Sequence, residues 1–463
     1  MDPDRLAEGL ARLQQGLDVV ARDHADFDAA RRVWNGLWDR RPAAVVRARS
    51  RDDVVATVRF AREHDALLAV RGGGHSLPGL STCDDGIVLD LSPMRSIAVD
   101  PEGRRATVGG GALLGDLDRA GEPFGLVTPA GVIAHTGVGG LTLGGGMGRL
   151  SRRLGLTIDS LEGVEMVLAD GRVVLVDAER EPDLFWAIRG GGGNFGVVTS
   201  FRFQMHDLGE VVAAEYSYAP EAAADALGGF AREAARAPRE MAVSLVATDS
   251  GVHLSVMRSG SPAPSDDLER FGRLGTPMDA SIGPVRFVEL QAAGDESMRW
   301  GRRIYSKGGF VADLDDEIVA IIADGAARAP TPDSEIYVIQ LGGAVADVDE
   351  AGTAYAGRSG GFFWIAQPVW DDPALDEACI AWGRDVAARL TARSLAANYV
   401  NEQADAGIAA SAYGATKLAR LGALKAEVDP TNLFRLNQNI APNAGVRDPV
   451  TAPTGAATQP GAD

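Results

Sequence analysis

The sequence predicts an α+β protein of two lobes, and three observations lead to this prediction. The 463 residues exceed the roughly 100–200 expected of one domain. Strand-like segments joined by tight turns dominate residues 41–206, whereas residues 207–400 mix alanine-rich helical stretches with strand-like runs. With 46% hydrophobic and 24% charged residues, the chain has the composition of a globular protein, which excludes a fibre or wholesale disorder.

A capped helix and two strands are predicted at the start of the first lobe. Ser50 occupies an N-cap position, and apolar residues follow it at helical spacing over residues 50–65. Short apolar runs at 67–70 and 87–91 predict two strands, which frame a glycine-rich loop at 71–76.

Two hairpins follow. One is predicted over residues 98–108, and a second over residues 164–176, where Asp170-Gly171 is a strong turn signal. Residues 109–148 are so rich in glycine that we expect no regular helix there and interpret them as a stretch that wraps a ligand. The alternating run at 197–205 predicts a half-buried strand that closes the first lobe.

The second lobe is predicted to combine helices with a sheet. Helical stretches lie at 221–237, 315–328 and 373–392, and strand-like segments at 242–247 and 334–341. After this lobe, a helix over 410–426 is predicted to end at Asp429-Pro430.

Charge and cysteine content limit the possible partners. The formal net charge is −19 and the sequence pI about 4.8, so we expect neither nucleic acid nor a membrane surface as a partner. Cys83 and Cys379 lie far apart and outside any zinc pattern, which favours two buried thiols and no metal. The N-terminus lacks an apolar signal segment, so a cytoplasmic location is predicted.

Glycine gathers in four clusters, at 71–76, 109–111, 136–148 and 189–196. Backbone amides without side chains can turn inward and receive a pyrophosphate closely. Any one cluster could be a set of tight turns, but four together favour an extended cofactor such as FAD. A GxGxxG match begins at Gly191, but a helical turn precedes it and a strand follows, the reverse of a Rossmann site.

Two of the six histidines lie beside these glycines. His75 follows three glycines, so its imidazole is predicted to project into whatever the loop holds, and a neutral imidazole is a competent nucleophile. His135, directly before Thr136-Gly137, is the second candidate.

These motifs resemble the vanillyl-alcohol-oxidase-type flavoproteins, and within them the berberine-bridge-enzyme-like branch of bacterial oxidoreductases. The resemblance runs from about residue 30 to 445 and is carried by Arg71-Gly72-Gly73-Gly74-His75-Ser76, Pro129-Ala130-Gly131, His135-Thr136-Gly137-Val138-Gly139-Gly140-Leu141, Gly144-Gly145-Gly146-Met147-Gly148-Arg149-Leu150, the stretch from Asp183 to Gly196, and Asn437-Gln438-Asn439-Ile440.

The resemblance implies a PCMH-type FAD-binding domain of two α+β subdomains and a substrate domain whose antiparallel sheet is flanked by helices. It divides the chain into an N-terminal helical segment (1–40), the FAD-binding domain (41–206), the substrate domain (207–400), a C-terminal segment that completes the FAD domain (401–445) and a disordered tail (446–463).

The resemblance also assigns cofactor contacts. His75 would carry the covalent bond to FAD, and because Ile133 stands where bicovalent relatives have a cysteine, one bond is expected. Val138 falls where the family tunes oxygen access, and valine there goes with oxidases. The residues that would contact FAD are Arg71, Gly72, Gly73, Gly74, His75, Ser76, Pro129, Ala130, Gly131, His135, Thr136, Gly137, Val138, Gly139, Gly140, Leu141, Gly144, Gly145, Gly146, Gly148, Val197, Asn437 and Asn439.

Tyr399 is the predicted catalytic residue, because Tyr399-Val400-Asn401 matches a Tyr-x-Asn motif of the family. A free tyrosine titrates near about 10, so a base role needs a lowered pKa, and otherwise Tyr399 orients the substrate or packs between the lobes. Gln340 is a second candidate, although strand alternation places it opposite Tyr337, so the two cannot share the site. The sequence departs from the family after Asn401, where Glu402 replaces an aromatic residue.

The resemblance therefore implies an FAD-dependent oxidase of a small-molecule alcohol, amine, sugar or natural-product intermediate, in which oxygen becomes hydrogen peroxide. The alternatives are a flavin-N5-oxide oxygenase, which His135-Thr136 and Leu141 also resemble, and a cyclase that keeps the flavin as a scaffold. The substrate and the oligomeric state stay open.

Overall fold

The N-terminal part of the chain contains a small mixed sheet. The computed structural model describes residues 3–260 and 266–443. The spatial order of the strands in this sheet is β1 (Asp18–Ala21), β2 (Ala44–Arg47), β4 (Ile87–Asp90) and β3 (Leu68–Arg71). β2 and β3 run parallel to β4, so β2 and β3 need a crossover, which α3 (Arg51–Glu63) supplies. The predicted cap is confirmed, because Ser50 and Asp53 exchange side-chain to backbone hydrogen bonds.

The N-terminal segment is not purely helical, which corrects the prediction for residues 1–40. It contains α1 (Pro3–Leu13) and α2 (Phe27–Ala30), but between them β1 pairs antiparallel with β2. Val19 and Val20 of β1 are buried. The strand extends the sheet and buries these two side chains, a tertiary contact that a four-residue segment does not reveal by itself.

A five-stranded antiparallel sheet forms the rest of the first lobe. Its order is β5 (Ile97–Asp100), β6 (Arg105–Gly109), β10 (Val197–Gln204), β8 (Leu161–Val167) and β9 (Val173–Asp177). Both predicted hairpins are confirmed, and Gly171 adopts φ +80° in the turn of the second.

The glycine-rich stretch does contain regular helices, against the prediction for residues 109–148. Helices α4 (Leu114–Gly121) and α5 (Val138–Gly144) both lie within it. Each glycine costs about 1 kcal/mol of helix propensity, but the buried faces of both helices pack into the core of the first lobe, and this burial outweighs propensity.

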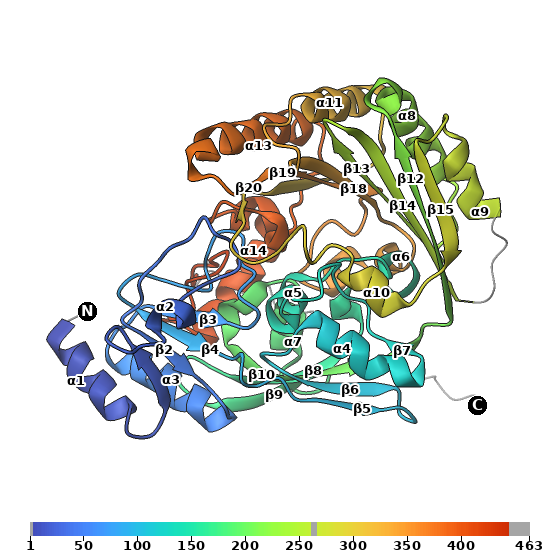
Figure 1. Ribbon diagram of the computed structural model, residues 1–463. Helices are drawn as coiled ribbons and strands as arrows, with labels where there is room; N and C mark the ends of the chain where they lie inside the picture. The colour runs from blue at the N-terminus through green and yellow to red at the C-terminus, as the bar shows by residue number, and fades with distance from the viewer. Residues whose placement is uncertain (1–2, 261–265, 444–463) are drawn as a thin grey trace, which may run out of the picture.

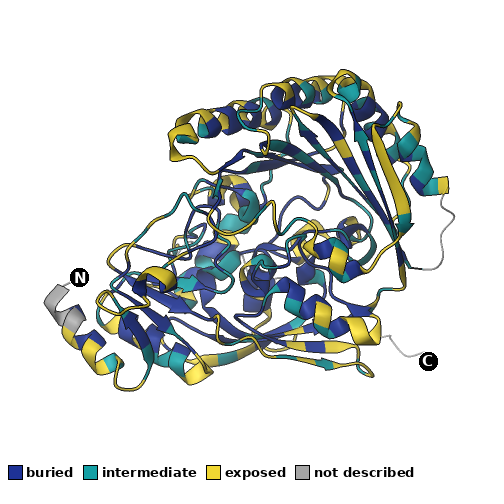
Figure 2. Ribbon diagram, viewed as in Figure 1, coloured by how far each residue is buried: buried dark blue, intermediate teal, exposed yellow. Residues whose placement is uncertain are grey.

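A seven-stranded antiparallel sheet dominates the second lobe (Figure 1). Its strands, in spatial order, are β15 (Asp279–Pro284), β12 (Glu210–Tyr218), β14 (Gly251–Gly260), β13 (Met241–Thr248), β18 (Glu335–Gln340), β19 (Phe362–Gln367) and β17 (Lys307–Val311). The predicted helices are confirmed as α8 (Ala223–Ala234), α11 (Asp316–Ala327) and α13 (Asp376–Thr391), which cover the outer face of the sheet. The interface between the sheet and these helices is buried, and the exposed residues lie on the outside of the helices (Figure 2).

The C-terminal helix α14 (Ala409–Val428) returns to the first lobe and packs against α7 (Pro182–Ile188). A buried ion pair fixes the segment that follows. The Lys425 ammonium contacts the Asp429 carboxylate and donates to Asn194 O at 2.6 Å, while Asp429 accepts from the Leu433 and Phe434 amides at 2.8 and 2.9 Å. The predicted tail at 446–463 lies outside the described residues.

The remaining elements are short. They are β7 (Leu126–Val127), β11 (His206–Asp207), β16 (Arg303–Ile304), β20 (Val369–Trp370), α6 (Ser151–Leu154), α9 (Asp266–Glu269), α10 (Phe287–Ala292), α12 (Ala344–Asp347) and the 3-10 turns η1 (Glu122–Phe124), η2 (Thr157–Asp159), η3 (Gly192–Phe195), η4 (Pro220–Ala222), η5 (Arg270–Arg273), η6 (Glu350–Gly352), η7 (Pro373–Leu375) and η8 (Val400–Glu402).

Both cysteines are buried free thiols, as expected. Among the helices that the structure describes, none has the length and hydrophobicity needed to cross a bilayer.

Candidate active site

A cavity of about 820 Å³ lies between the first lobe and the inner face of the seven-stranded sheet. This volume is within the range of roughly 300–1,000 Å³ typical of ligand sites. Glycine loops line one part of it, and residues of the large sheet line another. The sheet residues are Glu215, Ser244, Leu245, Val246, His253, Ser255, Glu335, Tyr337, Ile339, Phe363, Ile365 and Gln367.

Three glycine loops come together at the cavity from distant parts of the chain, at 72–74, 137–140 and 191–193. Gly73 and Gly137 lie against each other so closely that a Cβ on either would overlap the backbone of the other. Only glycine allows this approach, so the two clusters form one continuous wall.

This wall has donors suited to a phosphate-containing cofactor. Gly139 and Gly140 lie in the first turn of α5, where backbone N–H groups have no intrahelical acceptor. The buried Ser81 hydroxyl also lines the cavity and has no hydrogen-bond partner in the protein. Orphaned donors of this kind match the oxygens of a pyrophosphate, so the residues fit FAD.

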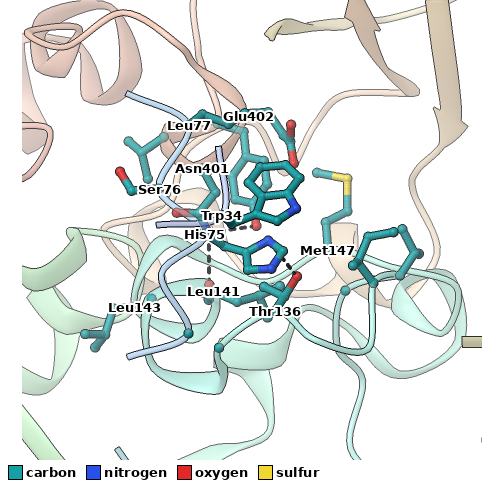
Figure 3. Close-up of a pocket in the computed structure, with 18 of the residues that line it drawn as sticks. Trp34, His75, Ser76, Leu77, Thr136, Leu141, Leu143, Met147, Asn401 and Glu402 are labelled. Atoms are coloured by element: carbon teal, nitrogen blue, oxygen red, sulfur yellow. Dashed lines mark hydrogen bonds between the residues drawn. The ribbon is translucent and has the colours of Figure 1, made fainter. Parts of the chain in front are cut away.

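His75 lies on the cavity wall between Trp34 and Thr136 (Figure 3). The Trp34 indole stacks on its ring at a centroid distance of 4.3 Å and an interplanar angle of 14°. His75 Nε2 lies 2.7 Å from His135 Nδ1, and His75 Nδ1 lies 3.3 Å from Thr136 Oγ1. When Nε2–H donates to His135, Nδ1 keeps its lone pair.

The surroundings of His75 keep it neutral. Burial, with a smaller contribution from the neighbouring His135, holds the pKa of His75 well below the usual value for histidine. A neutral ring whose Nδ1 carries the lone pair, here beside the Thr136 hydroxyl, is the nucleophilic form of histidine.

The other predicted cofactor residues divide into two groups. Those that line the cavity with His75 are Gly72, Gly73, Gly74, Ser76, Gly131, Thr136, Gly137, Gly139, Gly140, Leu141, Val197 and Asn437. Those that lie behind the wall are Arg71, Pro129, Ala130, His135, Val138, Gly144, Gly145, Gly146, Gly148 and Asn439.

Residues of the second group have structural partners. The buried Arg71 pairs with Asp90 at 2.8 Å, and a Cβ on Gly148 would overlap the Ala130 carbonyl. Packing demands therefore produce part of the glycine pattern that we interpreted as cofactor contacts.

Val138 does not border the cavity, and its predicted role in oxygen access stays a prediction. Its side chain is fully buried in the apolar core with Ala112 and Leu143. The helical period of α5 turns Val138 inward, whereas Gly139 and Gly140 reach the cavity.

Tyr399 lines the cavity, as predicted, but its environment opposes a base role. Its hydroxyl accepts from Gly146 N at 3.1 Å and from Asn401 Nδ2 at 3.0 Å, which leaves its own O–H free to donate. Burial raises the pKa of Tyr399, and the Asn401 hydrogen bond offsets this only in part. Tyr399 is therefore suited to orient a substrate.

Gln340 is not in the cavity, and the prediction of a catalytic role is wrong. Its side-chain amide donates to Ala234 O of α8, on the outer face of the sheet. Strand alternation instead turns Glu335, Tyr337 and Ile339 toward the cavity.

Two carboxylates on the wall were missed as site residues. Glu335 accepts from Gln367 Nε2 at 3.3 Å, and Glu402 accepts from Ser306 Oγ at 3.3 Å. Burial raises the pKa of each to about 7. The alternation of 335–340 and the position of Glu402 after the Tyr-x-Asn motif were signals that could have found them.

Strand register places these two carboxylates in one row. Glu335 of β18 pairs with Gln367 of β19. Ser306 lies beside Gln367, because the flanking residues Lys307 and Tyr305 pair with Ala366 and Pro368. Adjacent strands lie roughly 4.8 Å apart, so Glu335 and Glu402 stand at the two ends of a row that spans three segments.

Comparisons with known proteins agree with this geometry. Residues 42–177 match the family described as FAD binding domain, and residues 397–441 match the family described as berberine and berberine like. An FAD-linked oxidoreductase of Dictyostelium discoideum is 33% identical over 88% of this chain and 91% of its own length. The (R)-6-hydroxynicotine oxidase of Paenarthrobacter nicotinovorans is 30% identical over 92% and 96%.

Solved structures show the same fold. The crystal structure of 6-hydroxy-D-nicotine oxidase from Arthrobacter nicotinovorans is similar with a TM-score of 0.84 and 28% identity, over 92% of this chain and 98% of that one. Glucooligosaccharide oxidase from Acremonium strictum, whose FAD is described as 6-S-cysteinyl, 8α-N1-histidyl, has a TM-score of 0.84 at 24% identity, over 95% and 99%.

Proposed function

The chain belongs to the FAD-linked oxidoreductases with a berberine-like C-terminal segment, and from that premise we propose that it is an oxidase of small molecules whose FAD is bonded to His75. The proposed substrates are alcohols, amines, sugars or natural-product intermediates. The proposed electron acceptor is oxygen, which would be released as hydrogen peroxide. The names of related oxidases support this choice of acceptor.

The observation that carries the proposal is the position of His75. It stands where the glycine loops meet, with Nδ1 in the cavity wall and Nε2 held by His135. Trp34 covers one face of the ring and fixes its orientation. The ring is thus neutral, oriented and adjacent to the donors that fit a pyrophosphate.

Bound FAD would supply the acceptor for a substrate hydride. The side chains of this protein would manage the accompanying proton. Glu402, with a pKa of about 7, is the proposed base that takes the hydroxyl or amine proton of the substrate. Tyr399, held by Gly146 and Asn401, would donate its O–H to the substrate and orient it.

Acid denaturation tests the covalent bond. We expect the flavin to remain on the denatured wild-type chain and on the control variant His24→Ala, which changes an exposed histidine outside the cavity. The variant His75→Ala should release it. Absorbance and peptide mass report the result, and flavin released from the wild-type protein would disprove the covalent anchor.

The oxidase reaction needs a separate measurement. A substrate found by screening for peroxide release should consume one oxygen molecule for each peroxide formed. Incorporation of labelled oxygen into the product would instead favour the oxygenase alternative.

A further inference from the structure

The two missed carboxylates lack cationic partners. Within residues 3–260 and 266–443, neither Glu335 nor Glu402 makes an ion pair. The cations on neighbouring segments are already paired: Lys307 with Asp405 at 2.5 Å, Arg302 with Asp333 at 2.5 Å, and Arg303 with Asp376. A partly buried carboxylate with only neutral partners is costly when ionised, and a ligand cation would offset that cost.

The two cationic side chains on the cavity wall, His253 and Arg149, do not pair with either carboxylate. His253 contacts Glu215 at 2.8 Å, a pair that brings its own counter-charge. The Arg149 guanidinium donates to Gln291 at 3.1 Å and borders the same cavity. Behind the wall, Asp333 adds a further negative charge near Glu335.

Apolar side chains form most of the surface between these charges. They include Val132, Ile133, Leu290, Ile339, Phe363 and Ile365. A ligand that fits this lining has an apolar body, and a positive charge on that ligand would meet a carboxylate of the wall.

We propose that Glu335 determines specificity by binding an ammonium group of the substrate, so that the enzyme selects an amine with an apolar body. This inference rests on the proposed function. Glu402 adjoins Tyr399 and Asn401, where the proton is taken, whereas Glu335 stands at the far end of the row beyond Gln367. The ammonium group held by Glu335 is therefore separate from the carbon that is oxidised.

Binding of three matched probes to the holoenzyme tests the proposal. The probes are 4-phenylbutylamine, 4-phenyl-1-butanol and 4-phenylbutyrate, which share one body and differ in charge. We expect the amine to bind at least about tenfold more tightly than the other two at pH 8.5, because a hydrogen bond to a charged group contributes about 1.5–3 kcal/mol. Calorimetry without oxygen, together with a flavin absorbance spectrum that shows no reduction, measures binding separately from oxidation of the probe.

The preference should depend on pH. The ammonium probe stays protonated up to about pH 10, so a change between pH 6 and 8.5 reflects the protein. Because the pKa of Glu335 is about 7, its carboxylate forms as the pH rises, and amine binding should strengthen over this interval. Binding of the alcohol should stay constant.

Substitution at Glu335 separates its contribution from that of the other groups. Glu335→Gln should reduce the preference for the amine to less than about threefold, and Glu335→Asp should retain part of it. The control Glu179→Gln removes a carboxylate from an exposed loop and should change nothing. Glu335→Gln should bind the alcohol as tightly as the wild-type protein does, which would show that the cavity is intact.

Two results would overturn the proposal: an alcohol that binds as tightly as the amine, or a Glu335→Gln variant that keeps the preference. Neither result affects the proposed function, because acid-stable flavin and peroxide release are measured on the same preparation. If the wild-type protein showed neither acid-stable flavin nor peroxide release, the proposed oxidase function would be wrong, whereas the binding result would still hold.

Discussion

Burial leaves Glu402 close to half-ionised at neutral pH, since its pKa is about 7. A base must be deprotonated to act, so kcat at saturating substrate should rise as the pH increases from 6 to 8 and then level off. Glu402→Gln should lower kcat by about 10²–10⁴-fold and remove this inflection. Tyr399→Phe should slow the reaction but keep the inflection. Loss of the inflection in Tyr399→Phe alone would transfer the base role to the tyrosine.

At the scale of single residues, the sequence predicted His75 and Tyr399 on the cavity wall but could not rank the carboxylates. Alternation correctly showed that Tyr337 and Gln340 face opposite sides of one strand. Which side meets the cavity depends on the packing of α8 against the sheet, and that contact is not encoded in a six-residue run. Burial, which raises the pKa of Glu402, depends in the same way on distant segments.

The close approach of two glycine loops makes a prediction at the scale of elements. A methyl group on Gly73 would overlap the backbone of Gly137, so the loops must separate. We expect Gly73→Ala to cost about 1–3 kcal/mol of folding stability and to lower the ratio of flavin to protein. Gly16→Ala, where a Cβ meets nothing, is the control. Full flavin content in Gly73→Ala would show that the contact is not needed.

The buried ion pair of α14 makes a second prediction at this scale. Lys425→Met leaves the Asp429 carboxylate buried without a cation, so we expect a loss of about 3–5 kcal/mol in the free energy of unfolding. Denaturant titration measures it. Lys425→Met/Asp429→Asn should recover part of the loss, since the charge is gone. If Lys425→Met were as stable as the wild-type protein, the ion pair would not contribute to stability as expected.

Elements with strong local signals were predicted well. The capped helix α3 and the Asp170-Gly171 hairpin combine period and turn chemistry in a few residues. Helices α4 and α5 were missed because glycine suppresses the local helical signal, while their burial against the five-stranded sheet stabilises them. Local propensity fails where tertiary packing dominates.

At the scale of the whole molecule, Asn35 connects the two lobes through buried hydrogen bonds. Its fully buried amide donates to Leu77 O at 3.0 Å and Ile304 O at 2.8 Å, and its Oδ1 accepts from the Ile304 amide at 3.1 Å. Asn35→Ala leaves buried backbone groups unpaired, so we expect a loss of about 1–3 kcal/mol for each. Thermal denaturation should show a lower Tm, while the exposed control Gln15→Ala should not shift it.

The overall architecture could be predicted because the family motifs fix the order of cofactor loops along the chain. The sheet of the second lobe has no such motif, so its strands beyond the two predicted ones, including β17 and β19 that bring Gln367 beside Ser306, emerged only from the fold. Glu335, the proposed specificity residue, lies in this sheet on the predicted strand β18, and only the fold shows that it faces the cavity.

The cavity wall collects residues from Trp34 to Gln438, which has a consequence for biosynthesis. Domains usually fold from the N-terminus as a chain is synthesised. Here the first lobe cannot present a complete wall until the ribosome has translated residue 438, because Asn437 and Gln438 border the same space as Gly73. The cavity wall is therefore completed only after residue 438 has been translated, and a chain truncated before this segment would lack part of the wall.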